Sequence, residues 1–457
     1  MREAELKTLC KKLKPILGNR AEALWANYIS ADSFDAKHEA EALIQMIAAQ
    51  HLSSGVGDEP ILLPPPAAEA TKGEFLLGTV GYGGRQLAPL YLQRENFMKH
   101  LSIFGTTGSG KTNVAQSLLL GLLKQDVPFL VVDWKRSYYV LRDAPVAKAK
   151  TIQVYSVGRK GHTQFSWNPL RGPPGVHPKT WISVVAEALE KSHLSGPGVA
   201  DILIEALDKR FEDAGFYNGK VDQYPNFFDV TEELERVQFK GRRMLWQDSA
   251  MRIVRTFTFG PASGAFNSRH PIKLEELLDK PVVLELDQEL PKPLRVFFSD
   301  LLLRWIHLYR LGQGEVDRLR HVTFLEEVHN LFPRSQIEHQ STNSLENVFR
   351  EIRSFGEGLV SITQHPSLIP IYILGNCNTQ IYLGLQHEED IITARRALFL
   401  GRDEEAFLDK LQVGEGIVKI KGRTGPCLVR FPLVPITRTN SDDTNLGGDP
   451  LGTTHLD

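Results

Sequence analysis

Gly105–Thr112 reads GTTGSGKT, a glycine-rich motif. It matches G-x-x-x-x-G-K-[S/T] at every fixed position and follows the apolar run Leu101–Phe104. Apolar residues at helical spacing come directly after it: Val114, Leu118 and Leu122. A strand, a glycine-rich turn and a helix in this order are the context in which the motif forms a phosphate-binding loop. The sequence therefore predicts a nucleotide site here.

The residue types of this loop suit a triphosphate. Glycines let the backbone curl so that its N–H groups point at phosphate oxygens, and the N-terminus of the next helix adds partial positive charge. We expect Lys111 to reach the β- and γ-phosphates and the Thr112 hydroxyl to bind Mg²⁺. The expected ATP-binding residues are Gly105, Thr106, Thr107, Gly108, Ser109, Gly110, Lys111 and Thr112.

A second stretch, His321–Asn330, reads HVTFLEEVHN and is an apolar strand that ends in two carboxylates. Side chains at the carboxyl ends of parallel strands face the ligand in open sheets. We expect Glu326 to orient Mg²⁺ and Glu327 to act as the base that polarises the attacking water. A solvated acidic turn is the alternative, and the neighbouring phosphate loop makes the catalytic interpretation the better one.

From His100 onward, short apolar strands alternate with helical segments. This pattern is typical of an α/β fold whose mainly parallel sheet is buried on both faces. The expected strands are Leu101–Phe104, Pro128–Asp133, Thr151–Val157, Pro281–Asp287, Val322–Glu326, Leu359–Thr363, Gln380–Leu385 and Gly416–Lys421. Residues 74–93 look like two more strands around a glycine-rich turn.

The composition of the chain changes along its length, which suggests a division into regions. We expect a helical N-terminal region (1–55), a Pro-rich linker (56–73), an ATPase domain (74–435) with a mainly helical insertion at about 178–279, and a flexible tail (436–457).

Composition narrows the class of protein. The 457 residues are 42% hydrophobic and 24% charged, which excludes disorder throughout, and the net charge of -2 argues against a free-standing basic nucleic-acid binder. Cys10, Cys377 and Cys427 lie too far apart for a disulfide framework. The uncharged stretch Gly358–Gln386 contains Pro, Asn and Gln, so it reads as two buried strands and not as a membrane span. We expect a soluble, cytoplasmic protein without a membrane partner.

Five blocks carry a family resemblance: GTTGSGKT, FLVVDWKRSY (Phe129–Tyr138), FLEEVHNLFPR (Phe324–Arg334), FREIRSFGEGLVSITQHPSLI (Phe349–Ile369) and LQVGEGIVKIKG (Leu411–Gly422). In their order and spacing, from about Leu77 to Val434, the chain resembles the HerA/FtsK superfamily of hexameric DNA-pumping ATPases, closest to its HerA-like branch. The resemblance implies a RecA-like P-loop core that uses ATP and Mg²⁺.

The resemblance also implies residue roles. Lys111 and Thr112 would bind ATP–Mg²⁺ with Glu326 supporting the metal, and Glu327 would activate water. Gln364 would sense the γ-phosphate, although it could instead only cap its strand. The remaining implied residues are Arg350 or Arg353 as a finger toward the neighbouring subunit's ATP, and Asp133 as the acid of the second-strand motif. For Arg350 the alternative is a local pair with Glu346.

What the resemblance implies for function is a homo-hexameric ring that moves double-stranded DNA through its pore and serves a separate nuclease or other effector. The basic turn Gly158–His162 is a candidate pore loop or an ordinary solvated turn. Two alternatives stay open: a nucleotide-switched scaffold for an effector protein, and a secretion-system ATPase. The chain departs from the family in lacking the Gly-Glu that usually follows the second-strand acid, and in having a helical N-terminus where HerA proteins often have a β-barrel.

Overall fold

The computed structural model describes residues 3–52, 61–147, 150–158, 163–218, 223–332 and 344–435. The expected tail, 436–457, and most of the candidate pore turn, Arg159–His162, lie outside these ranges.

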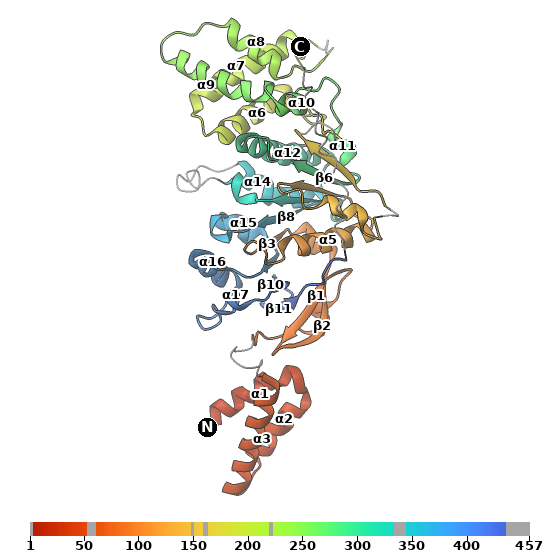
Figure 1. Ribbon diagram of the computed structural model, residues 1–457, viewed down its shortest axis with the longest axis vertical. Coiled ribbons are helices and arrows are strands. Elements are labelled where there is room, and N and C mark those ends of the chain that lie inside the picture. The colour runs from red at the N-terminus through yellow and green to blue at the C-terminus, as the bar shows by residue number, and fades with distance from the viewer. Residues whose placement is uncertain are drawn as a thin grey trace, which may run out of the picture.

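The described residues build one 11-stranded sheet in the order β2-β1-β11-β10-β9-β3-β8-β7-β4-β6-β5 (Figure 1). The strands from β9 to β5 are parallel to one another, and β10, β11, β1 and β2 continue the sheet in antiparallel pairing. The strands are β1 (Phe75–Tyr82), β2 (Arg85–Leu92), β3 (Leu101–Phe104), β4 (Phe129–Asp133), β5 (Gln153–Val157), β6 (Pro281–Leu286), β7 (His321–Glu326), β8 (Glu357–Thr363), β9 (Thr379–Tyr382), β10 (Glu415–Ile420) and β11 (Cys427–Arg430). The predicted α/β fold with a mainly parallel sheet is confirmed.

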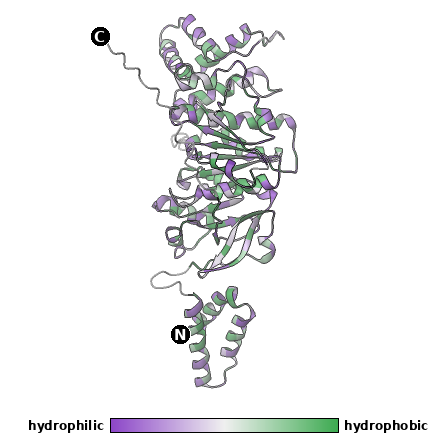
Figure 2. Ribbon diagram, turned by 45° about the vertical axis from the view of Figure 1, so that its right-hand side comes forward, coloured by the Kyte–Doolittle hydropathy of each residue, from purple (hydrophilic) through white to green (hydrophobic). Residues whose placement is uncertain are grey.

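Helices cover both faces of the sheet, which explains why its strands are continuously apolar. In β4, Val131 packs on the same side as α5, while Leu130 and Val132 face the cluster that contains α12. Figure 2 shows largely hydrophobic central strands inside a more hydrophilic shell. The helices are α1 (Glu3–Leu17), α2 (Asn19–Ile29), α3 (Phe34–Leu52), α4 (Arg94–Met98), α5 (Lys111–Lys124), α6 (Pro178–His193), α7 (Pro197–Asp213), α8 (Phe227–Arg236), α9 (Arg242–Thr258), α10 (Pro261–Phe266), α11 (Leu274–Leu277), α12 (Lys292–Gln313), α14 (Ser344–Glu351), α15 (Ile371–Asn376), α16 (Glu388–Leu398) and α17 (Phe407–Lys410).

The N-terminal helices α1–α3 form a small bundle on the turn between β1 and β2 (Figure 1). Leu13, Ala21, Ala48 and Tyr82 share one buried cluster. The Tyr82 hydroxyl donates a hydrogen bond to the carbonyl of Lys12 (2.8 Å). The helical N-terminal region expected from the sequence is therefore present, and it is seated on the end of the hairpin.

The insertion between β5 and β6 is helical, as predicted, and contains α6–α11. Its aromatic side chains Phe227 and Phe257 stack with ring centroids 4.3 Å apart, and Phe257 also contacts Phe297 of α12 at 4.8 Å. The insertion thus shares a core with the helix that covers the sheet, and it does not fold as an isolated lid.

Two further expectations concern single elements. The uncharged stretch Gly358–Gln386 contains β8 and β9, as predicted, separated by a short 3-10 turn (Pro366–Leu368) and α15. The strand β11 was not predicted. Within the described part of the chain, no helix has both the length and the apolar character needed to cross a bilayer.

Candidate functional site

The phosphate loop connects β3 to α5 at the carboxyl edge of the parallel strands, as its sequence pattern predicts. Gly108 (φ 83°) and Gly110 (φ 108°) have left-handed backbone conformations that favour glycine over other residues. Gly110 directly precedes the first turn of α5. The loop therefore leads into a 14-residue helix whose N-terminus faces the place where phosphate would bind.

Lys111 is folded back onto its own loop. Its Nζ donates hydrogen bonds to the carbonyls of Gly105 (2.6 Å) and Thr106 (2.8 Å), and only 8% of the residue is exposed. Burial, aided by the nearby charge of Lys135, lowers the pKa of Lys111 to about 8. Phosphate oxygens would compete with these carbonyls for the ammonium group, which then regains a full partner charge. Thr112 lies beside it in the first turn of α5.

The closing sequence block reaches the phosphate loop from the C-terminal end of the domain. The N–H of Gly414 donates to the carbonyl of Ser109 (3.2 Å). Asn113 of α5 donates to the carbonyl of Pro432 (2.8 Å) and accepts from the N–H of Val434 (2.9 Å). The segments on either side of β10 and β11 therefore hold the loop and its helix in place.

Glu326 ends β7 as a buried carboxylate with two hydrogen bonds. Oε1 accepts from the Tyr138 hydroxyl (3.1 Å), and Oε2 accepts from the N–H of Trp134 (3.3 Å). Burial and the neighbouring charge of Asp133 raise the pKa of Glu326 to about 8. The charge of Lys135 offsets these two effects only in part. Carboxylate and hydroxyl oxygens are the ligands that Mg²⁺ prefers, so Glu326 and Thr112 fit the metal expected there.

Asp133 is fully buried at the end of β4. Its carboxylate accepts hydrogen bonds from the backbone N–H groups of Lys135 (2.9 Å), Ser137 (2.7 Å) and Tyr138 (3.1 Å). The side chain is therefore committed to the turn that follows β4. It positions Lys135 and Tyr138, so the nucleotide contact expected for Asp133 itself would be indirect.

Glu327 lies at the centre of a chain of polar side chains from four elements. Its Oε1 accepts from Lys135 Nζ (2.5 Å) and Gln364 Nε2 (3.2 Å), and the Oε1 atom of Gln364 accepts from the Thr107 hydroxyl (3.0 Å). Burial alone would raise the pKa of Glu327, but the hydrogen bond and charge of Lys135 hold that pKa below its usual range. Glu327 is therefore ionised and directed at the phosphate loop, in a left-handed backbone conformation (φ 47°) that is uncommon for this residue type.

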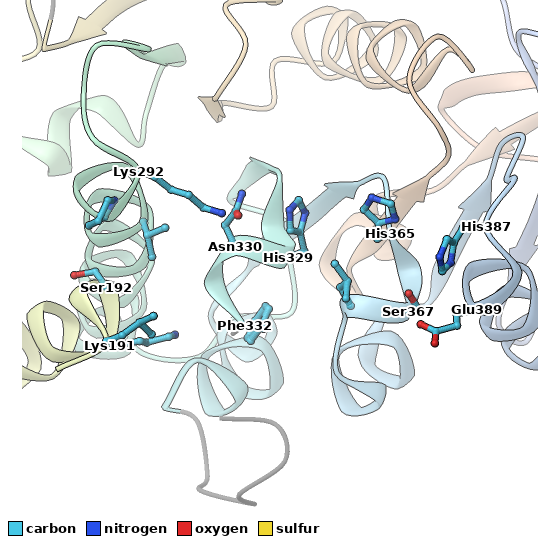
Figure 3. A pocket seen from close by; sticks show the side chains of 14 residues that line it. Lys191, Ser192, Lys292, His329, Asn330, Phe332, His365, Ser367, His387 and Glu389 are labelled. Atoms are coloured by element: carbon cyan, nitrogen blue, oxygen red, sulfur yellow. The ribbon is translucent and has the colours of Figure 1, made fainter. Parts of the chain in front are cut away.

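An open cavity of about 670 Å³ lies beside this chain (Figure 3). It is lined by His329, whose Nδ1 lies 3.4 Å from Glu327 Oε2 and 2.9 Å from the Thr363 hydroxyl, and by His365, next to Gln364. Lys292 and His387 also face the cavity (Figure 3). Glu327 is therefore connected to this cavity through His329.

The two candidate finger residues are not near this site. Arg353 lies between α14 and β8, just before the amino end of β8, and Arg350 lies in the last turn of α14. Both side chains are exposed, and Arg350 donates to Asn347 Oδ1 (2.9 Å). The phosphate loop follows the carboxyl end of β3, which is parallel to β8, so the arginines lie at the opposite edge of the sheet.

The sequence predicted Lys111, Thr112, Glu326, Glu327 and Gln364, and the structure gathers all five at the carboxyl edge. Three further residues of the site were not predicted: Lys135 and His329, which contact Glu327, and Tyr138, which contacts Glu326. Lys135 and Tyr138 stand two and five residues after Asp133, where a parallel strand ends. Polar residues at such positions face the site in open sheets, and this was the available signal.

Comparisons with known proteins agree with this geometry. Residues 76–209 match the family model described as the central domain of the helicase HerA. The probable helicase MJECL08 of Methanocaldococcus jannaschii is 21% identical over 366 residues, an alignment that spans 74% of this chain and 66% of that protein.

Solved structures share the fold. VirB4 of Thermoanaerobacter pseudethanolicus superposes with a TM-score of 0.61 at 16% identity, covering 84% of this chain and 99% of VirB4. The plasmid coupling protein TrwB, in complex with ADP and Mg²⁺, gives a TM-score of 0.58 at 13% identity, covering 84% of this chain and 98% of TrwB. Residues 76–209 thus match the model of the HerA central domain, and the chain shares its fold with VirB4 and TrwB.

Proposed function

We propose that this protein is an ATP-driven motor that moves double-stranded DNA as a hexameric ring. The observation that carries the proposal is the continuous chain from Thr107 through Gln364 to Glu327, which joins an intact phosphate loop to an ionised carboxylate. The match to a helicase central domain supports nucleic acid as the polymer on which the motor acts.

Hydrolysis would use these side chains in distinct roles. Lys111 would leave its loop carbonyls to bind the β- and γ-phosphates, and Gln364 would report on the γ-phosphate through its contact with Thr107. Glu327 would accept the proton of a water aligned with the γ-phosphate. Thr112 and Glu326 would hold Mg²⁺, which would supply charge neutralisation for the transferred phosphoryl group.

The ring is proposed because one chain does not complete the site. Phosphoryl transfer gains much of its rate from an arginine that stabilises the transition state, and no arginine of the described residues contacts the Glu327 chain through a hydrogen bond or ion pair. Arg350 and Arg353 are exposed at the opposite edge of the sheet. In a closed ring this edge would meet the phosphate loop of the next subunit.

ATPase activity tests the proposal directly. We expect Mg²⁺-dependent ATP hydrolysis that double-stranded DNA stimulates at low salt, and rings in negative-stain images with ATP and DNA. Contacts to DNA phosphates should make binding fall steeply with salt and show little sequence preference. A protein that hydrolyses ATP but shows neither DNA binding nor DNA stimulation would favour the nucleotide-switched scaffold.

An effector partner, such as a nuclease, is part of the proposal, and the N-terminal helices are its docking platform. Large apolar side chains are exposed there, including Phe34 (85%) and Met46 (62%). We expect Phe34→Ser with Met46→Ser to abolish co-purification of the partner while DNA-stimulated ATPase activity is retained. Loss of both properties would instead place these helices in the motor itself.

A secretion-system role is the second candidate, and the fold shared with VirB4 and with the conjugative coupling protein TrwB favours it. Fractionation of cells that express the protein distinguishes the two. A motor of this kind docked on a membrane complex would sediment with membranes, whereas the DNA pump proposed here would not need to.

A further inference from the structure

The nucleotide site contains a second lysine that the phosphate-loop motif does not include. Lys135, in the turn after β4, places its Nζ 2.5 Å from Oε1 of Glu327. Lys135 and Lys111 are close enough for the charge of one to disfavour the charge of the other. Two ammonium groups therefore border the same space, one engaged by loop carbonyls and the other by the carboxylate of the proposed base.

Neighbouring groups hold the backbone of Lys135 in place, and its side chain is partly exposed. Asp133 holds the N–H of Lys135, and Arg136, in a left-handed conformation (φ 55°), lies 3.4 Å from Glu285. The Arg295 guanidinium packs 5.0 Å from the centre of the Trp134 ring. The Lys135 side chain is 42% exposed, whereas that of Glu327 is 12% exposed. The lysine thus has a backbone that is held in place and a side-chain end that solvent and ligand can reach.

We propose that Lys135 is a second phosphate-binding cation, specific for the γ-phosphate, which Glu327 holds until ATP arrives. This inference rests on the proposed function. A γ-phosphate beside Lys135 carries more negative charge than one carboxylate and offers more acceptor oxygens, so it competes for the ammonium group. ADP lacks these oxygens and leaves the pair with Glu327 intact.

The exchange has a consequence for Glu327. While Lys135 is bound to it, the carboxylate of Glu327 is neutralised by an ammonium group, which makes it a weaker proton acceptor. When Lys135 moves to the γ-phosphate, Glu327 keeps the hydrogen bond from Gln364 but loses this cation and becomes a stronger base. The same movement therefore favours ATP over ADP and releases the base only when a hydrolysable phosphate is present.

Substitution of Lys135 should leave the fold intact, because its own side chain is 42% exposed and Glu327 keeps the hydrogen bond from Gln364. The test measures the affinities of fluorescent ADP and of a non-hydrolysable ATP analogue, both with Mg²⁺, for wild type, Lys135→Met and Lys135→Arg. Lys124→Met removes an equal charge from an exposed position at the end of α5 and serves as the control.

We expect Lys135→Met to lower the affinity for the ATP analogue by about tenfold or more, while the affinity for ADP changes by less than about twofold. Lys135→Arg should recover part of the loss, and Lys124→Met should match wild type. Equal weakening of both nucleotides would overturn the inference, because it would indicate a general electrostatic effect. Unchanged affinity for both would also overturn it.

Repeating the Lys135→Met substitution in Glu327→Gln protein shows whether Lys135 contacts the γ-phosphate or only neutralises the charge of Glu327. If Lys135 acts only by neutralising Glu327, the effect of Lys135→Met should vanish once Glu327→Gln has removed that charge. If Lys135 binds the γ-phosphate, the loss of about tenfold should persist in the Glu327→Gln background. Wild type that binds neither nucleotide would overturn the proposed function. Wild type that binds both, with its preference unchanged in Lys135→Met, would overturn only the assignment of Lys135.

Discussion

The amino ends and the carboxyl ends of the parallel strands, called here the amino edge and the carboxyl edge, each contain a buried glutamate. The hydrogen-bond partners and nearby charges of the two glutamates differ. Glu357, at the amino end of β8, is fully buried and accepts from His321 Nδ1 (2.6 Å), the Thr323 hydroxyl (2.8 Å) and Arg310 Nε (3.1 Å). Glu326, at the carboxyl end of the adjacent β7, faces the Tyr138 hydroxyl, one backbone N–H and the acidic side chain of Asp133.

The pKa values differ in the same sense. Burial alone would raise the pKa of Glu357, but the charges of His321 and Arg310 hold it below its usual range. Burial and the charge of Asp133 raise the pKa of Glu326 to about 8. A buried carboxylate with a full set of donors is part of the architecture, whereas one left short of positive charge marks a place where a cation binds. The carboxyl edge is thus organised for a ligand, and the amino edge is already complete.

The amino ends of the strands should also take part in catalysis, through Arg353. Arg353→Ala should lower ATP turnover by about 10³–10⁵-fold, the range known for arginine fingers. The matched control is Arg318→Ala, an exposed arginine that also lies close before β7 and should have no such effect.

Mixing tests whether Arg353 acts across subunits. A mixture of Arg353→Ala and Glu327→Gln chains should recover some activity, because certain interfaces then contain both intact halves. A mixture as inactive as either parent, with co-assembly demonstrated, would remove Arg353 from the neighbouring site.

The next effect concerns the carboxyl edge alone. Glu327→Gln should lower turnover by about 10²–10⁴-fold, since an amide cannot take a proton from water. Nucleotide affinity and the thermal midpoint should be retained, because the amide oxygen can still accept from Lys135 and Gln364. Turnover at the wild-type rate would show that another group is the base.

The comparison itself is sharpened by paired substitutions at the two buried glutamates. Glu357→Gln should destabilise the protein by about 3–5 kcal/mol, because it leaves Arg310 buried without its counter-charge. Glu326→Gln should change stability far less, since the folded protein already favours the uncharged form of this carboxyl. Urea unfolding measures both, and similar losses for the two variants would contradict the distinction between the edges.

The loss of folding stability at acid pH should arise in part from protonation of Glu357. Its pKa is lower in the folded than in the unfolded protein, so the stabilisation is present above its unfolded pKa of about 4.3 and is lost as pH falls below that value. Unfolding midpoints measured from neutral pH down to acid should therefore fall more steeply for wild type than for Glu357→Gln. Parallel curves would assign acid sensitivity to other groups.

The smallest expected effect is at Tyr138. Tyr138→Phe removes the hydrogen bond to Glu326 and should cost about 1 kcal/mol of stability. Added Mg²⁺–ATP should stabilise this variant as much as wild type if Thr112 and Glu326 hold the metal without help from Tyr138. A large loss of Mg²⁺-dependent stabilisation would place the tyrosine in the metal site.

Most of the site residues at the carboxyl edge were predictable, because they occur in short continuous stretches of sequence. The phosphate loop and the Glu326–Glu327 pair each follow an apolar strand, so a local pattern identifies them. The pairing of Lys135 with Glu327 was not predictable, since it depends on β4 and β7 lying side by side across 192 positions of chain (327 − 135). The same holds for Glu357 and His321, whose contact follows from the register of β7 against β8.

The antiparallel half of the sheet was also only partly predictable. The hairpin β1–β2 was expected, but β11, which links it to β10, was not. The strand Cys427–Arg430 is as short as Leu101–Phe104, but no motif follows it as the phosphate loop follows Leu101–Phe104, so the sequence around it does not identify it.

The hairpin that carries the N-terminal helices has a mechanical consequence. From β3 the sheet passes through β9, β10 and β11 to β1, four strand spacings, or about 19 Å. Hydrogen-bonded strands resist bending within the plane of the sheet, so we expect this half of the sheet to move as one rigid unit. A small rotation of β3 on nucleotide exchange would swing the helices through a wider arc. Spin labels on α3 and α12 would record that movement as a nucleotide-dependent distance. A distance that does not change with the nucleotide would contradict it.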